Sequence, residues 1–331
     1  MSTVGIIANP SAGKDIRRLV SQSRFVSNQE KINILARVIN GLTASGVSKI
    51  LGMPDSGQLL RNAALLSNTD VEMSYLDIPI LNNETDTVNS ANLMAKQGAK
   101  VIITLGGDGT NRAVALGTCE IPLMPLSTGT NNVFPTALEG TLAGMAAGCI
   151  ASNKVSAKLC TYKAKKIVVD KNDAPCDVAL VDVAISSERF VGSRAIWNIA
   201  SVRELYLAIA SPHSIGLSSI GGLIDPISTT DESGLHIGLS EDYNDRYVLA
   251  PVIPGELERV HVKYVNRMKI LETLEVRHKP CTIALDGERS IIVRVGDTAN
   301  LTLTKEGPPV IKAEIALQAA ASNGIYLSDN L

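Results

Sequence analysis

The residues best suited to chemistry lie together in one short segment. Three glycines, an aspartate and a threonine gather there, at Gly106, Gly107, Asp108, Gly109 and Thr110. Glycine lets the backbone approach a ligand closely and adopt left-handed torsion angles. Successive N–H groups in such a turn can form a nest for an anion, and a helix beginning near Asn111 would add its positive end. The segment therefore predicts a phosphate-binding turn; the alternative is a tight strand-to-helix turn capped by aspartate.

A carboxylate inside a phosphate cradle needs a chemical reason, because it would otherwise repel the phosphates. We expect Asp108 either to bind Mg²⁺, directly or through water, or to accept the proton of an incoming hydroxyl. Two well-known phosphate motifs do not fit. The Walker pattern requires Ser or Thr after Gly13-Lys14, where this chain has Asp15. The dinucleotide fingerprint requires a third glycine where this chain has Arg112.

Strand-like and helix-like runs alternate through the first half of the chain and flank the glycine-rich segment. Apolar strand-like runs occupy residues 4–8, 49–53, 71–78, 101–105 and 121–126, and helix-like segments occupy 30–42, 58–66, 85–97 and 138–150. Such alternation indicates a parallel sheet with helices on both faces, whose ligands bind at the carboxyl ends of the strands. Both glycine-rich segments, 106–110 and 127–130, fall at that end.

The pattern changes after about Ser152 to short strand-like runs separated by turns. Residues 311–321 are helix-like again, with a small apolar face of alanines that requires burial. We therefore predict an α/β fold with a doubly wound nucleotide-binding domain at residues 1–152 and a β-rich substrate domain at residues 153–308. The C-terminal helix, within residues 309–331, is predicted to pack back on the first domain.

Composition argues against several classes of partner. The formal net charge is −2 and aromatic residues make up 3% of the chain, so neither charge nor base stacking favours nucleic acid. Five cysteines without a CxxC pair indicate reduced thiols, and the histidines show no metal-ligand spacing. We find no signal peptide and no apolar run of about 20 residues. We expect a cytoplasmic protein without a membrane partner and interpret the lysines between residues 154 and 171 as a solvated face.

Four segments, in order along the chain, resemble motifs of the NAD kinase and diacylglycerol kinase superfamily. Residues 9–14 (NPSAGK) are similar to its first nucleotide loop, and residues 106–110 (GGDGT) to its signature motif. Residues 127–134 (STGTNNVF) resemble the GTxN segment of the lipid-kinase branch, and residues 285–288 (LDGE) resemble its late DGE motif. The resemblance spans nearly the whole chain and is strongest to ATP-NAD kinase-like proteins of the acetoin catabolism protein X type.

This resemblance implies an ATP-dependent kinase with its site in the cleft between two domains. Phosphates of ATP would lie on the glycine-rich turn and the first loop, at Gly106, Gly107, Gly109, Thr110, Asn9, Ser11 and Gly13. The nucleotide would also be held by Thr130, Asn131 and Asn132. Mg²⁺ would be bound by Asp108 with Asp286, and the catalytic base would be Asp108 or Glu288. Homo-oligomers are common in this superfamily, so we expect one here.

The acceptor is predicted to be a soluble, nucleotide-like molecule, with NAD as a candidate. Residues 179–185 resemble the NAD kinase strand that carries an Asn-Glu pair for the dinucleotide, but here the pair reads Val181-Asp182. Valine makes no hydrogen bond to a ribose or an adenine edge, so Asp182 is the predicted substrate contact, with a simple strand-end carboxylate as its alternative. Two other functions stay open: a diacylglycerol-type lipid kinase, favoured by the GTNN and DGE segments, and a non-catalytic nucleotide sensor.

Overall fold

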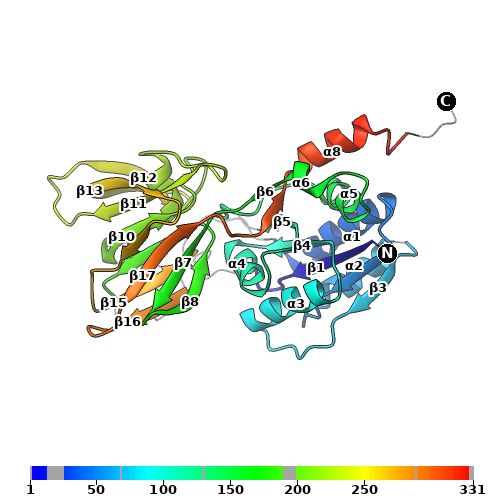
Figure 1. Ribbon diagram of the computed structural model, residues 1–331, viewed down its shortest axis with the longest axis horizontal. Coiled ribbons are helices and arrows are strands. Elements are labelled where there is room, and N and C mark those ends of the chain that lie inside the picture. The colour runs from blue at the N-terminus through cyan, green and yellow to red at the C-terminus, as the bar shows by residue number, and fades with distance from the viewer. Residues whose placement is uncertain are drawn as a thin grey trace.

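The computed structural model describes residues 2–12, 26–67, 69–128, 131–188, 199–287 and 289–327. Its first domain is built on a seven-stranded sheet in the order β3-β2-β1-β4-β5-β18-β6 (Figure 1). The strands are β1 (Thr3–Ala8), β2 (Lys49–Gly52), β3 (Glu72–Tyr75), β4 (Val101–Gly106), β5 (Leu123–Ser127), β18 (Pro309–Ile311) and β6 (Thr161–Lys163). All neighbours pair in parallel except β18 and β6. Chain order reverses direction between β1 and β4, which makes their carboxyl ends the switch point where such sheets bind ligands.

Helices cover both faces of this sheet. On one face lie α1 (Asn28–Ala44), α2 (Leu59–Leu66), α5 (Gly140–Ala151) and α8 (Ala313–Ser322), which share a core with alternate residues of β1 and β4. On the other face lie α3 (Glu84–Lys96) and α4 (Asp108–Gly117). The first domain is therefore doubly wound.

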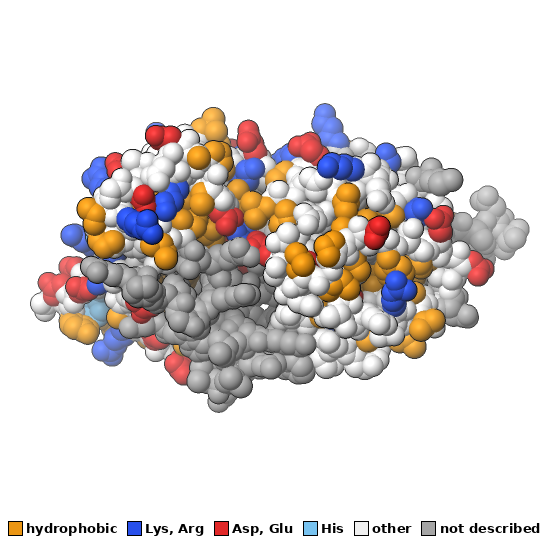
Figure 2. All heavy atoms as spheres, turned by 90° about the horizontal axis from the view of Figure 1, so that it is seen from below, with side chains coloured by type: hydrophobic (Ala, Val, Ile, Leu, Met, Phe, Trp, Pro, Cys, Tyr) orange, Lys and Arg blue, Asp and Glu red, His pale blue; other side chains and the backbone are white. Residues whose placement is uncertain are grey.

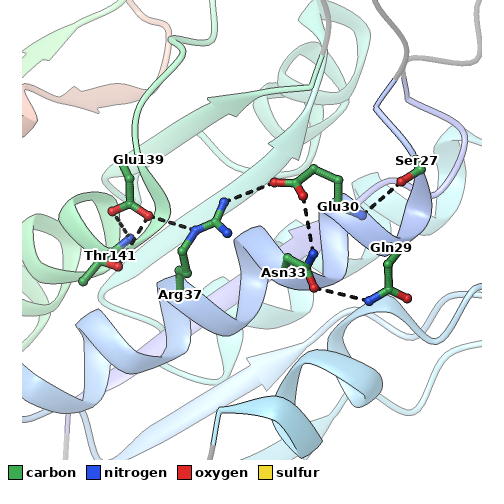
Figure 3. Close-up of polar contacts among 7 residues, drawn as sticks. All are labelled: Ser27, Gln29, Glu30, Asn33, Arg37, Glu139 and Thr141. Atoms are coloured by element: carbon green, nitrogen blue, oxygen red, sulfur yellow. Dashed lines mark hydrogen bonds and ion pairs between the residues drawn. The ribbon is translucent and has the colours of Figure 1, made fainter.

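Local sequence explains how α1 begins and how it is fixed. The Ser27 hydroxyl caps the helix by accepting the Glu30 N–H at 3.1 Å. Farther along, the Arg37 guanidinium pairs with Glu30 at 3.2 Å and with Glu139, the cap of α5, at 2.9 Å (Figure 3). The two helices meet at glycines: a Cβ added to Gly144 would lie 2.2 Å from a backbone oxygen of α1.

Two antiparallel sheets form the second domain. The larger has the order β12-β13-β11-β10-β9-β15-β16 and the smaller β14-β17-β7-β8. Their strands are β7 (Lys166–Lys171), β8 (Ala174–Ala179), β9 (Asp182–Ser186), β10 (Val202–Leu207), β11 (Ser233–Leu239), β12 (Tyr247–Ile253), β13 (Glu256–Lys269), β14 (Thr273–Glu275), β15 (Cys281–Leu285), β16 (Arg289–Val293) and β17 (Ala299–Thr304). One apolar core lies between the sheets, and the short helix α7 (Leu217–Gly222) packs on the other face of the larger sheet.

The chain then returns to the first domain (Figure 1). Strand β18 pairs with β5, and Ala316 and Ala320 of α8 are fully buried in the same core as α1 and α5. Beyond α8, the Tyr326 hydroxyl lies 2.8 Å from Ser45 Oγ and 3.0 Å from Cys149 Sγ. The helix predicted from residue 311 begins only at Ala313, because Val310 and Ile311 extend the sheet instead.

The fold predicted from the sequence, a doubly wound α/β domain followed by a β-rich domain, is confirmed. Within the described ranges, no helix has both the length and the apolarity to cross a bilayer.

On the face drawn in Figure 2, basic and acidic side chains are interspersed over both domains. The predicted basic face is partly used in structural contacts: Lys163 Nζ donates to the Cys119 carbonyl at 3.1 Å, and Lys165 is buried.

Candidate functional site

Three turns meet at the carboxyl ends of the adjacent strands β1, β4 and β5. We call residues 9–12 the first turn, residues 106–110 the second turn, and residues 127–128 with 131–134 the third turn. The Asn9 N–H donates to the Leu105 carbonyl at 3.1 Å, and Asn9 Nδ2 donates to Thr110 Oγ1 at 3.1 Å. The Thr128 N–H donates to the Gly106 carbonyl at 3.3 Å. Three segments singled out in the sequence therefore form one surface, together with the start of α4.

The second turn needs glycine for space. Gly107 caps α4 with φ −104°, and Asp108 is already the first residue of the helix. A Cβ on Gly107 would lie 2.9 Å from Asn132 Oδ1, and one on Gly106 would lie 2.5 Å from Thr110 Oγ1. Neither Gly106 nor Gly107 has a left-handed backbone torsion, so the torsional freedom of glycine is not what these two positions require. The first N–H groups of α4 lie at this end, and such groups have no hydrogen-bond acceptor within their own helix. The positive end of the helix dipole lies here as well.

Asp108 joins the second turn to the third. Its carboxylate accepts the Val133 N–H at 3.1 Å to each oxygen and the Phe134 N–H at 2.8 Å. Within the third turn, Asn132 Nδ2 donates to Ser127 Oγ at 2.8 Å. Asn131 lies in the same turn. The predicted roles of Asp108 as base and metal ligand stay predictions; its observed contacts are those of an anchor between two turns.

Two residues that support these turns were not identified from the sequence. Lys31 of α1 is fully buried, and its Nζ donates to the carbonyls of Asn9, Pro10 and Ala12 at 3.2, 3.0 and 2.7 Å. The only available signal was its spacing, because Lys31 falls on the apolar face that contains Leu35. Asn111 is also buried. Its Oδ1 accepts from Thr104 Oγ1 at 2.7 Å, while its Nδ2 donates to the Gly107 carbonyl at 2.8 Å.

Asp286 and Asp182 lie together in the second domain. The Asp286 carboxylate accepts N–H groups of Leu180, Val181 and Asp182 at 3.0, 2.8 and 3.1 Å, and burial raises its pKa. The Asp286 N–H donates in turn to the Asp182 carbonyl at 2.9 Å. These contacts hold the junction between β8 and β9. The proposed metal role of Asp286 and substrate role of Asp182 stay predictions.

A buried apolar cluster connects this junction to the third turn. Leu180 and Val181 are fully buried in the cluster that contains Phe134 and Val114. Through Phe134, the second-domain junction therefore lies against the turn that Asp108 anchors. Gly13, Thr130 and Glu288 lie outside the described residues.

Mg²⁺ usually takes one or two protein carboxylates together with substrate phosphate oxygens. Asp108, half-buried at the start of α4, fits that limited role. Across the described part of the chain, no group of three or more His, Cys, Asp or Glu side chains is arranged to hold a metal ion. A cation here would therefore depend on the phosphates of the bound nucleotide for most of its ligands.

An ion pair between α4 and β8 joins the two domains. Arg112 of α4 is buried, and its NH1 donates to Asp177 Oδ1 of β8 at 2.5 Å. Its NH2 pairs with Glu84 at the start of α3.

Two protein-family models match successive parts of the chain. Residues 4–152 match the ATP-NAD kinase N-terminal domain, and residues 165–306 match the acetoin catabolism protein X C-terminal domain. Acetoin catabolism protein X of Cupriavidus necator is 36% identical over 312 residues, which is 91% of this chain and 87% of that protein. A solved diacylglycerol kinase structure from Bacillus anthracis Sterne is 12% identical with a TM-score of 0.47, over 94% of this chain and 96% of that one. With a kinase-like first domain and this extended sequence identity, the chain belongs to the acetoin catabolism protein X family.

Proposed function

We propose that the protein is an ATP-dependent kinase that transfers a phosphoryl group to a hydroxyl of a soluble, nucleotide-like acceptor, with NAD as the first candidate. One observation carries the proposal. Three turns from the carboxyl ends of β1, β4 and β5 meet around the start of α4, at the switch point of a doubly wound sheet. The N-terminus of α4 lies there, and the first N–H groups of a helix are groups that bind phosphates.

Each turn has a part in the proposed reaction. Gly106, Gly107, Gly109 and Thr110 would cradle the phosphates of ATP, and the first turn would contact them from the side that Lys31 supports. Bound Mg²⁺ would neutralise charge on the phosphates. Asp108 would hold that ion or take the hydroxyl proton, and Glu288 is the competing base. Phosphoryl transfer needs mainly positioning and charge stabilisation, so a rigid arrangement of turns suits it.

The acceptor would approach from the second domain. Asp182 is the first residue of β9, and its neighbour Asp286 holds the backbone of residues 180–182. Val181 is fully buried, so a ribose or adenine contact at this strand would come from Asp182 rather than from the side chain at position 181. We propose that this reaction takes place in the cytoplasm, where ATP and dinucleotides are both available.

A nucleotide sensor is the second candidate. The carboxylates of Asp108 and Asp286 both receive backbone N–H groups, which suits an anchoring role as well as a catalytic one.

A radiolabel assay separates the candidates. The full-length protein would be incubated with γ-labelled ATP and Mg²⁺, with NAD, NADH, nucleosides or diacylglycerol in mixed micelles as acceptor. We expect label in the dinucleotide or nucleoside and none with Gly107→Val. Label in diacylglycerol would make the protein a lipid kinase. ATP binding without transfer to any of these acceptors would favour the sensor.

A further inference from the structure

The buried guanidinium of Arg112 connects the helix that begins in the second turn to the second domain. Arg112 lies one turn along the helix that begins at Asp108, and its side chain is 2% exposed. It pairs with Glu84 inside the first domain and with Asp177 across the domain boundary. Its Nε has no hydrogen-bond partner among the residues that the structure describes, so these two carboxylates are its hydrogen-bonding anchors there.

The strand that carries Asp177 leads directly to the acceptor side, because β8 ends at Ala179, immediately before the Leu180–Asp182 backbone. Asp286 in turn holds the Leu180–Asp182 backbone, where the proposed acceptor contact lies. One side chain therefore connects the helix that carries the second turn with the segment that carries Asp182.

A buried ion pair is weak support for stability, because desolvation offsets much of the Coulomb attraction. The planar fork of arginine does, however, fix the geometry of its carboxylate partners. We propose that Arg112 is a positioning residue that sets the distance between the phosphate-binding second turn and the acceptor side of the second domain. The inference rests on the proposed kinase function and adds the residue that aligns donor and acceptor.

The two carboxylates offer a matched pair of variants. Asp177→Asn and Glu84→Gln each remove one negative charge from the same guanidinium, and both native side chains are 14% exposed. Only Asp177 lies in the other domain. We expect Asp177→Asn to lower kcat by about tenfold or more, since small misplacements of reacting groups are costly, with the KM for ATP within about twofold. Glu84→Gln should lower kcat by less than about threefold.

A conservative variant adds a second comparison. Arg112→Lys keeps the positive charge, but one ammonium cannot hold both carboxylates in the fork geometry. It should lower kcat as Asp177→Asn does. If the two ion pairs only stabilised the fold, the fall in kcat of each of the three variants would track its fall in melting temperature. Glu84→Gln would then lower kcat as much as Asp177→Asn. That pattern, or an unchanged kcat in Asp177→Asn, would overturn the inference.

Hydrogen exchange with ATP–Mg²⁺ supplies a measurement that does not need turnover. In the wild type, we expect ATP to protect the three turns and also residues 177–182. Asp177→Asn should lose the second effect, and Glu84→Gln should keep it. Protection confined to the turns in the wild type would contradict the positioning role while leaving the kinase proposal intact. No protection anywhere would show that the ATP site itself is wrong.

Discussion

Asp108 accepts the backbone N–H of Phe134 at 2.8 Å, across 26 residues of chain. This bond joins the turn after β4 to the turn after β5, and Phe134 is in turn buried with Val181 of the second domain. The aspartate proposed to serve Mg²⁺ or a proton is thus also an anchor of the surface around it. The two roles predict different consequences when the residue is changed.

Asp108→Asn tests these roles. The amide keeps the shape of the side chain but has one acceptor oxygen and cannot act as a base. We expect turnover to fall by at least about 10² if Asp108 acts in catalysis. The free energy of unfolding should fall by only about 1 kcal/mol from the weakened Val133 and Phe134 bonds. Ser127→Ala is the control, because it disturbs the third turn through the Asn132 bond and leaves the Asp108 carboxylate in place. A loss of turnover no larger than that of Ser127→Ala would make Asp108 an anchor alone.

Lys31→Met should weaken ATP binding while the protein stays folded. The ammonium holds three carbonyls of the first turn, and hydrogen bonds to a charged group are worth about 1.5–3 kcal/mol, so we expect ATP affinity to fall tenfold or more. Because three carbonyls lose their donor, the free energy of unfolding should also fall, by about 1–3 kcal/mol, which leaves a folded protein. Isothermal titration and thermal unfolding measure the two effects. Lys49→Met, which breaks only the surface pair with Glu72, should bind ATP as the wild type does; equal affinities in all three proteins would exclude a role for Lys31.

Gly144→Ala tests the packing of α1 on α5. The added methyl would lie 2.2 Å from the Val38 carbonyl oxygen, and backbone cannot move aside cheaply. Overpacking should lower the free energy of unfolding by about 1–3 kcal/mol, although the better helix propensity of alanine opposes it by about 1 kcal/mol. Gly296→Ala is the control, since nothing lies within 4 Å of its added Cβ. Denaturant unfolding measures the free energy of unfolding of both variants. Equal values for Gly144→Ala and Gly296→Ala would contradict the close helix contact.

Acid stability should depend on Glu204. Burial alone would raise its pKa, but hydrogen bonds from His236 and Tyr206 outweigh burial and hold the pKa below its ordinary value of 4.5. A carboxyl group with a lowered pKa stabilises the fold above that ordinary value and loses this contribution as the pH falls through the folded-state pKa. The wild type should therefore be more stable than Glu204→Gln near neutral pH, and the difference should shrink between about pH 5 and pH 3. A difference in unfolding free energy that grows over that range would contradict the assignment.

Sequence patterns could predict the sheet and the three turns because each depends on local signals. Apolar runs ending in Asn9-Pro10, Gly106-Gly107 or Ser127-Thr128 specify strands that stop at one edge, and parallel pairing then brings those ends together. The supporting residues could not be predicted in the same way. The partners of Lys31 lie about twenty residues before it, and those of Arg112 lie 28 and 65 residues away. Only the packed fold determines such pairs.

Position 181 shows a related limit. Its strand resembles a strand that carries an Asn-Glu pair for a dinucleotide, and this chain has Val181-Asp182 there. Val181 is fully buried among Leu180, Phe134 and other apolar side chains, so an asparagine would instead place an amide in a dry core. The sequence of one strand does not show which of its side chains a neighbouring domain buries.

ATP binding to the wild type and to Gly107→Val, measured by calorimetry with Mg²⁺, tests the central claim most directly. A branched side chain at position 107 would occupy the space next to Asn132 that the proposed phosphates share. We expect the wild type to bind ATP and the folded variant to bind at least about tenfold more weakly, a difference of about 1.4 kcal/mol or more. Equal affinity in a folded Gly107→Val protein, or no ATP binding by the wild type, would contradict a nucleotide site at these three turns.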